Sequence, residues 1–204
     1  MTETGVYQTI AQASFAEFKD RGSRFLAFAY PIQTVNDFKE KLQLLKKEHP
    51  KAVHHSFAYR LGLDNNNFRA SDDGEPSGTA GKPILGQIDS KELTNVLIIV
   101  VRYFGGTLLG VPGLINAYKS AAAMALQLTP FIQKPVMARW QLTFNYTQMN
   151  EVMRWIKAFN CDIIQQEMQL FCNMIIDVPK SRADELISLL SQLNGVELNQ
   201  AKTT

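Results

Sequence analysis

The residues with the clearest potential for chemistry lie in two glycine-rich segments, SDDGEPSGTAGKP at residues 71–83 and RYFGGTLLGVPG at residues 102–113. Eight of the twelve glycines in the chain fall between Gly74 and Gly113. Because glycine weakens helices and strands, such a cluster indicates tight turns or a backbone that approaches something closely. The two segments contain five charged side chains: Asp72, Asp73, Glu75, Lys82 and Arg102.

The first segment has the residue types of an anion site. Gly78, Thr79 and Gly81 are small residues at the start of an expected helix, where backbone N–H groups favour a phosphate or carboxylate. Lys82 follows directly, although the spacing is not that of a Walker loop. The acids just upstream would repel an anion unless they cap the helix, bind a cation, or pair with Lys82 or Arg102. Anion contact and a purely structural capped turn both stay open.

The second segment follows an apolar run and begins with Arg102 and Tyr103. Arginine can hold a phosphate, an aromatic ring can stack on a base, and open sheets bind ligands at the carboxyl ends of their strands. The alternative is an ion pair from Arg102 to Asp72 or Asp73 that joins the two segments. Both interpretations can hold at once.

The three histidines, His49, His54 and His55, lie within seven residues of one another. Neighbouring residues on a strand point to opposite faces, so a zinc site is not expected here. His54 or His55 could face the glycine segments as an acid, a base or an anion contact, or could be structural. Ser71 and Ser77 lie in no nucleophile elbow. The clustered acids could hold Mg²⁺, but acids in a glycine loop more often cap turns.

Apolar spacing predicts the elements that must position these residues. We expect strands at residues 6–13, 23–30, 54–61, 68–71 and 96–103, turns at residues 17–24 and 64–67, and helices that run from the cap Thr34 to Pro50, over residues 78–88 and over residues 113–129. The run at residues 96–103 is rich in β-branched residues and uncharged until Arg102, which is typical of a buried strand. This order predicts an α+β or α/β first domain, residues 1–134.

A second domain is expected over residues 135–204, after a linker at residues 133–135. We expect strands at residues 138–146, 161–168, 170–178 and 196–199, one helix from Thr147 to Phe159, and a second that begins at Pro179 or Ser181 and stops at Gly195. The order β-α-β-β-α-β is the split βαβ of ferredoxin-like folds.

Net charge, cysteine spacing and the length of the apolar runs narrow the class of protein. A net charge of +2 demands neither a nucleic acid nor a membrane as partner. Cys161 and Cys172 have no CxxC spacing, so we expect reduced thiols without a disulfide partner. Residues 1–5 are not basic, no apolar leader follows, and no apolar run approaches the roughly 20 residues that span a bilayer. We therefore expect a cytoplasmic protein with no membrane partner.

The central segments closely resemble a known signature. SDDGEPSGTAGKPIL followed by VVRYFGGTLLGVPGLINAYKSAA is similar to the motif of the YigZ/IMPACT family, as is H-P-x-A-x-H-H at residues 49–55. The resemblance spans residues 15–130 and implies the fold of the second domain of ribosomal protein S5. Residues 140–200 are similar to the C-terminal domain of bacterial members, which is ferredoxin-like and resembles a terminal domain of elongation factor G.

The resemblance also implies a role in translation. Eukaryotic IMPACT relatives regulate translation initiation by competing for a protein activator of a stress kinase, and that partner is not carried over to this chain. Both folds are shared with the translation machinery, so we expect a non-enzymatic regulator that binds RNA, the ribosome or a translation factor. The ferredoxin-like domain would use its sheet face or an edge strand for RNA or protein.

Two alternatives stay open. One is an enzyme acting on a small phosphorylated or nucleotide substrate, with Asp72, Asp73 or Glu75 as acid/base or Mg²⁺ ligands and Lys82 or Arg102 on the phosphate. The other is a protein-docking module whose glycine segments are only structural. We assign no catalytic residue, metal ligand or cofactor. The candidate ligand or anion contacts are His54, Asp72, Asp73, Glu75, Gly78, Thr79, Gly81, Lys82, Arg102, Tyr103, Gly105, Gly106 and Lys119.

Overall fold

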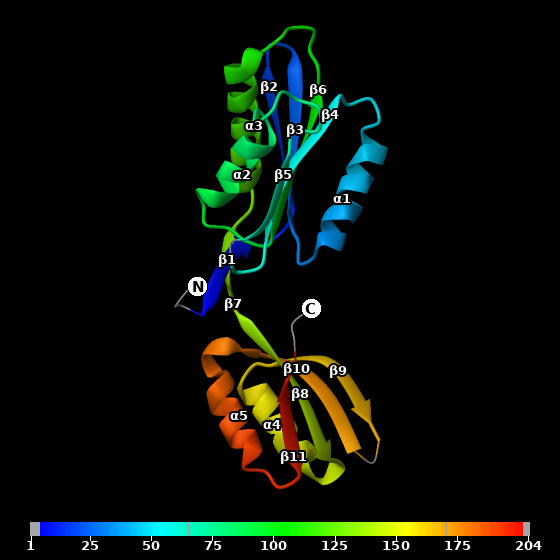
Figure 1. Ribbon diagram of the computed structural model, residues 1–204, viewed down its shortest axis with the longest axis vertical. Coiled ribbons are helices and arrows are strands. Elements are labelled where there is room, and N and C mark those ends of the chain that lie inside the picture. Colours follow the sequence, from blue (N-terminus) through cyan, green and yellow to red (C-terminus); the bar gives the residue numbers. More distant parts are fainter. Residues whose placement is uncertain (1–4, 65, 170, 202–204) are drawn as a thin grey trace. The chain divides into compact units, whose positions relative to one another are not determined.

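The computed structural model describes residues 5–64, 66–169 and 171–201. These residues form two compact units, residues 7–134 and residues 135–201 together with Gly5 and Val6 (Figure 1). Asn65 of one expected turn, Leu170 of one expected strand and the first four residues of the chain lie outside the described residues. None of the helices in this described part is long and apolar enough to cross a membrane.

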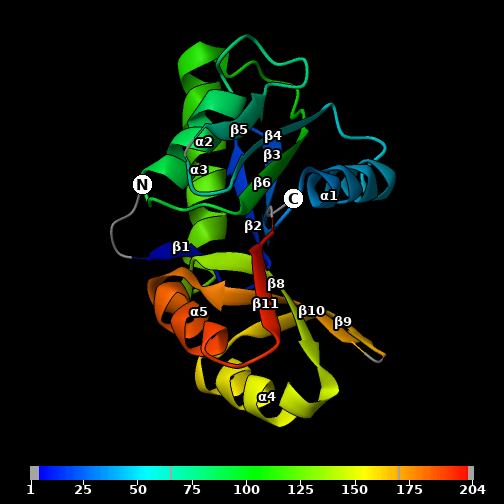
Figure 2. The same ribbon diagram turned by 60° about the horizontal axis from the view of Figure 1, so that its bottom comes forward.

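The first unit is built around a five-stranded antiparallel sheet. Its elements in chain order are β1 (Val6–Ile10), β2 (Ser14–Asp20), β3 (Ser23–Pro31), α1 (Val35–Glu48), β4 (His54–Leu61), β5 (Asn67–Ser71), α2 (Gly81–Asp89), β6 (Val96–Tyr103), α3 (Gly110–Gln127) and β7 (Phe131–Pro135). The sheet order is β2-β3-β6-β4-β5, and β1 pairs separately with β7. In Figure 1 and Figure 2, α2 and α3 lie on one side of the large sheet and α1 on the other.

Strand register decides which side chains share a face. In β6, Arg102 is opposite His54 of β4 and Phe25 of β3, so these three side chains point to the side that α2 and α3 cover. Tyr103 is the next residue, is opposite Arg24 and points to the α1 side. The central position of β6 explains why its residues from Val96 to Arg102 are all buried.

The expected cap of α1 is confirmed. The Asp37 N–H donates to Thr34 Oγ1 at 3.1 Å, and the Thr34 N–H donates to Asp37 Oδ2 at 3.0 Å. This reciprocal arrangement satisfies backbone donors that the first helical turn leaves free.

The second unit has the ferredoxin-like order. Its elements are β8 (Met137–Asn145), a 3₁₀ turn η1 (Tyr146–Gln148), α4 (Met149–Ala158), β9 (Asp162–Met168), β10 (Phe171–Pro179), a 3₁₀ turn η2 (Lys180–Arg182), α5 (Ala183–Ser191) and β11 (Val196–Gln200). The antiparallel sheet runs β11-β8-β10-β9, and α4 and α5 lie on one side of it (Figure 1). The predicted α+β class and the βαββαβ order are confirmed.

The turn predicted at residues 17–24 exists but is shorter than predicted. Residues 14–20 form β2, and the connection to β3 is only Arg21 and Gly22, both with positive φ. The charged residues that suggested a turn pair across the hairpin, since Arg24 Nε donates to Glu17 Oε1 at 2.7 Å. Alternation of Ala16 and Phe18 toward the core was the stronger signal.

Four predicted boundaries also differ. The expected linker at residues 133–135 belongs to β7, which pairs with β1. The first strand ends at Ile10 instead of Ala13, and α3 begins at Gly110 instead of Gly113. Helix α2 begins at Gly81 instead of Gly78, because the preceding residues form a separate turn around Asp72.

Candidate functional site

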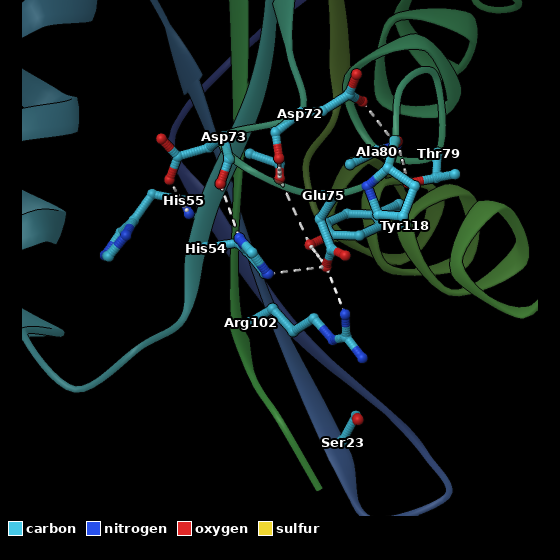
Figure 3. Close-up of polar contacts among 12 residues, drawn as sticks. Ser23, His54, His55, Asp72, Asp73, Glu75, Thr79, Ala80, Arg102 and Tyr118 are labelled. Atoms are coloured by element: carbon cyan, nitrogen blue, oxygen red, sulfur yellow. Dashed lines mark hydrogen bonds and ion pairs between the residues drawn. The ribbon is translucent and has the colours of Figure 1, made fainter. Parts of the chain in front are cut away.

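The two glycine-rich segments meet through a buried ion pair (Figure 3). Arg102 Nη1 donates to Glu75 Oε1 at 2.6 Å, and the Tyr118 hydroxyl of α3 donates to the same oxygen at 2.7 Å. His54 Nε2 lies 3.8 Å from this oxygen. The side chains of Glu75 and Arg102 are only 3% and 7% exposed, so each charge depends on the other for compensation.

Aromatic rings surround this pair. The Arg102 guanidinium carbon lies 5.3 Å from the centre of the Phe25 ring and 5.8 Å from that of Phe104. Tyr118 packs its ring edge-on against Phe25 at 5.1 Å. Burial raises the pKa of the Tyr118 hydroxyl, which therefore stays a proton donor to Glu75.

Asp72 occupies the place where an external anion was expected. Its carboxylate accepts hydrogen bonds from the N–H groups of Gly78 at 2.8 Å, Ala80 at 3.0 Å and Gly81 at 2.8 Å. Burial alone would raise the pKa of Asp72, but these three donors outweigh it and lower the pKa. The remaining N–H, of Thr79, donates to the Pro76 carbonyl. The backbone of this segment therefore already holds a carboxylate of its own chain.

Asp73 fixes the two neighbouring histidines in different ways. Its Oδ2 accepts from the His55 N–H at 2.6 Å, and its carbonyl oxygen lies 2.7 Å from His54 Nδ1. Because a carbonyl oxygen can only accept, His54 carries a proton on Nδ1, and its Nε2 faces the Glu75 carboxylate. His55 points to the α1 side, where burial lowers its pKa.

Two glycines bring the backbones together. A Cβ on Gly81 would lie 2.6 Å from the backbone nitrogen of Ser71, and one on Gly105 would lie 1.9 Å from the carbonyl carbon of Gly22. The Gly105 N–H donates to the hydroxyl of buried Ser23 at 3.2 Å. Both glycines therefore permit a close approach of two backbone segments.

The structure does not gather all candidates on one surface. It brings together His54, Glu75 and Arg102, and it holds Asp72 against residues 78–81. Tyr103 points to the opposite face, where its hydroxyl lies 2.9 Å from His49 Nδ1. Four other candidates remain solvent-exposed: Lys82, Gly105, Gly106 and Lys119.

The predicted ion pair between Arg102 and one of the aspartates is wrong, because the partner of Arg102 is Glu75. Both aspartates instead accept backbone N–H groups. Sequence reasoning also missed Tyr118 as a member of the site. The only signal for it was a tyrosine on the inward, alanine-rich face of an expected helix.

The chemistry open to this arrangement is narrow. Among residues 5–64, 66–169 and 171–201, no group of three or more histidines, cysteines and carboxylates is placed to hold a metal ion. The carboxylates of Asp72, Asp73 and Glu75 each accept hydrogen bonds from the chain itself. Hydrogen bonds and an ion pair between polar side chains hold the segments at residues 71–83 and 102–113 together.

Comparisons with known proteins agree with the sequence signature. The model of the Impact N-terminal domain family matches residues 21–126. The chain is 31% identical to an IMPACT family member of Haemophilus influenzae, over 86% of each chain. It is also 31% identical to the IMPACT family member YigZ of Escherichia coli, over 84% of this chain and 85% of that protein.

A solved structure extends the likeness to both units. The crystal structure of a hypothetical protein, 27% identical in sequence, matches 98% of this chain and 100% of its own with a TM-score of 0.79. The fold and the signature therefore lead to one assignment: the chain belongs to the IMPACT family.

Proposed function

We propose that this IMPACT-family protein is a non-enzymatic, cytoplasmic regulator of translation that binds RNA, the ribosome or a translation factor. The observation that supports a binding role most directly is that the polar side chains of the signature motif bind one another and the backbone. Its carboxylates accept hydrogen bonds from Arg102 and from the backbone, instead of surrounding an open reaction centre. The role in translation rests on family membership and on the folds that the family resemblance implies.

An enzyme would need groups that are free to exchange protons or to hold a substrate phosphate. Asp72 is a poor base because its hydrogen bonds lower its pKa. Glu75 is buried beneath Arg102 and Tyr118. Lys82 and Lys119 stay exposed and are the cations of the original candidate set that can meet an anionic partner directly.

The test is association with ribosomes and with RNA over a series of salt concentrations. We expect cosedimentation with ribosomes or anisotropy binding to RNA, with affinity that falls as salt rises because phosphate contacts release counterions. Lys82→Ala with Lys119→Ala should flatten the salt dependence if these lysines contact phosphate.

A protein that binds no ribosome, RNA or translation factor at low salt would contradict the proposal. A thermal-shift screen with nucleotides, with and without Mg²⁺, tests the enzyme. Stabilisation by one nucleotide that Asp73→Asn abolishes would favour catalysis on a phosphorylated substrate instead.

A further inference from the structure

An open surface lies on the face of the five-stranded sheet opposite the signature motif. Helix α1 packs against β4 and β6, and the outer residues of β2 and β3 stay partly exposed. Phe15 of β2 is 48% exposed, and its register partner Phe28 on β3 is only half-buried. This part of the sheet therefore has apolar side chains that face solvent.

Aromatic rings form a continuous row on this surface. Phe15 and Phe28 lie 4.9 Å apart between ring centres, and Phe28 and Tyr30 lie 6.4 Å apart with planes parallel to within 3°. His49 lies 5.8 Å from Phe28 and 6.0 Å from Tyr103. We call these five residues the aromatic strip. Phe28, Tyr30 and Tyr103 are partly buried because they also pack against the hydrophobic core on the α1 side, whereas Phe15 is exposed.

Cations border the aromatic strip. Lys41 Nζ lies 5.3 Å from the centre of the Tyr30 ring, and the Arg24 guanidinium carbon lies 5.9 Å from that of Tyr103. Lys19 is exposed on the same face of β2, where its Nζ lies 3.6 Å from Glu17 Oε1. Two carboxylates stand nearby. A hydrogen bond from Arg24 lowers the pKa of Glu17, and the charge of Glu48 reaches Tyr30. Lys19 and Arg24 therefore share Glu17, and Lys41 also lies near Asp37 of α1.

The open face of the other sheet has a different character. Register places Arg139, Thr143 and Asp177 on the side of the four-stranded sheet away from its core, together with Glu167 and Glu197. Arg139 is already bound to Asp177 through two hydrogen bonds of 2.7 Å. Among the described residues this face is acidic, so it does not suit a polyanion. Its aromatic side chain is Phe171, at the end of β10.

We infer that the aromatic strip is a binding surface for single-stranded RNA. Unpaired bases stack on exposed aromatic rings, and Lys19, Arg24 and Lys41 lie where phosphates beside those bases would pass. A duplex hides its base faces, so single strands fit this surface better. The inference rests on the proposed function and names the surface and the class of partner through which it acts.

The test uses the full chain and a short, labelled single-stranded RNA in an anisotropy assay. Phe15→Ala combined with Tyr30→Leu should weaken binding about tenfold or more, because each stacked base loses its platform. Lys41→Gln alone should weaken it less and reduce the salt dependence. Ultraviolet cross-links to the RNA should map to β2 and β3.

Phe68→Ala is the matched control. Phe68 is 50% exposed, but it pairs with Arg60 in register and so lies on the other face of the same sheet. Its loss should leave RNA affinity unchanged, and a circular dichroism spectrum like that of the parent should confirm that each variant folds.

Three results would overturn the inference. Equal weakening by Phe68→Ala would show a nonspecific effect, and cross-links confined to residues 135–201 would place the RNA elsewhere. Binding to ribosomes or a translation factor without any binding to single-stranded RNA would remove this surface but keep the proposed function. A protein that binds none of these partners would contradict both the inference and the proposed function.

Discussion

The two faces of the five-stranded sheet use similar residue types in opposite ways. On the side of α2 and α3, Arg102 is buried among Glu75, Phe25 and Tyr118, and both Arg102 and Tyr118 donate to the Glu75 carboxylate. On the side of α1, Arg24 and Tyr103 make the same kind of cation–π contact but remain partly exposed. The difference lies in what covers them, since the same two strands supply residues to both faces.

This difference assigns stability to the face under α2 and α3, and binding to the face on the side of α1. Buried charges that are fully paired cost much free energy to disturb, whereas exposed rings and cations contribute little to stability. The signature motif should therefore hold the first unit together, and Phe15, the exposed ring of the aromatic strip, should be dispensable for folding. Substitutions ordered by their expected effect on stability test this division.

The largest effect is expected for Gly105→Ala. The added Cβ would lie 1.9 Å from the Gly22 backbone, and no flexible side chain is there to move aside. We expect a loss of about 4 kcal/mol or more, or failure to fold. Gly86→Ala is the control, because a Cβ there meets nothing within 4 Å and the residue lies inside α2, so the midpoint of urea unfolding should stay the same or rise. Equal midpoints for both variants would show that the segments do not approach closely.

Arg102→Met should cost about 3–5 kcal/mol in urea unfolding, because it leaves the Glu75 carboxylate buried without its counterion. Adding Glu75→Gln to this variant should restore part of the loss. Arg139→Met, which breaks the more exposed pair with Asp177, should cost less than about 1 kcal/mol. Similar losses from both arginines would contradict the contrast between a buried and an open ion pair.

Asp72→Asn should destabilise the protein by about 1–2 kcal/mol at neutral pH, because a neutral amide holds the three N–H groups less well than a carboxylate. Folding lowers the pKa of Asp72, so its stabilisation is complete above the ordinary value of 3.8 and is lost as pH falls through the lower folded value. The difference between parent and variant should shrink over that acidic range in thermal unfolding. A constant difference would show that the carboxylate charge does not matter.

Phe15→Ala should have the smallest effect on stability, within about 0.5 kcal/mol, because the ring is half exposed. The same substitution should reduce affinity for single-stranded RNA. Calorimetric unfolding and anisotropy binding of one preparation measure both quantities. A large loss of stability with unchanged binding would reverse the roles assigned to the two faces.

Much of the fold was predictable from local pattern. Strand β4 was predicted with its exact bounds, as was β6. The Thr34 cap of α1 was also correct, because capping depends on residues three apart. Strand β2 was missed, since its charged residues are stable in a strand only when Arg24 of the next strand meets them. That contact cannot be read from β2 alone.

The sequence by itself determined the two-unit α+β organisation, the family signature and a glycine cluster that indicates tight turns or a close backbone approach. Only the tertiary structure decided that Glu75, instead of either aspartate, pairs with Arg102, and that Asp72 fills the expected anion position. It also placed Tyr103 on the face opposite Arg102, within the aromatic strip. The physical reason is that strand register and helix coverage set which side chains meet, and these arise from contacts between residues distant in sequence.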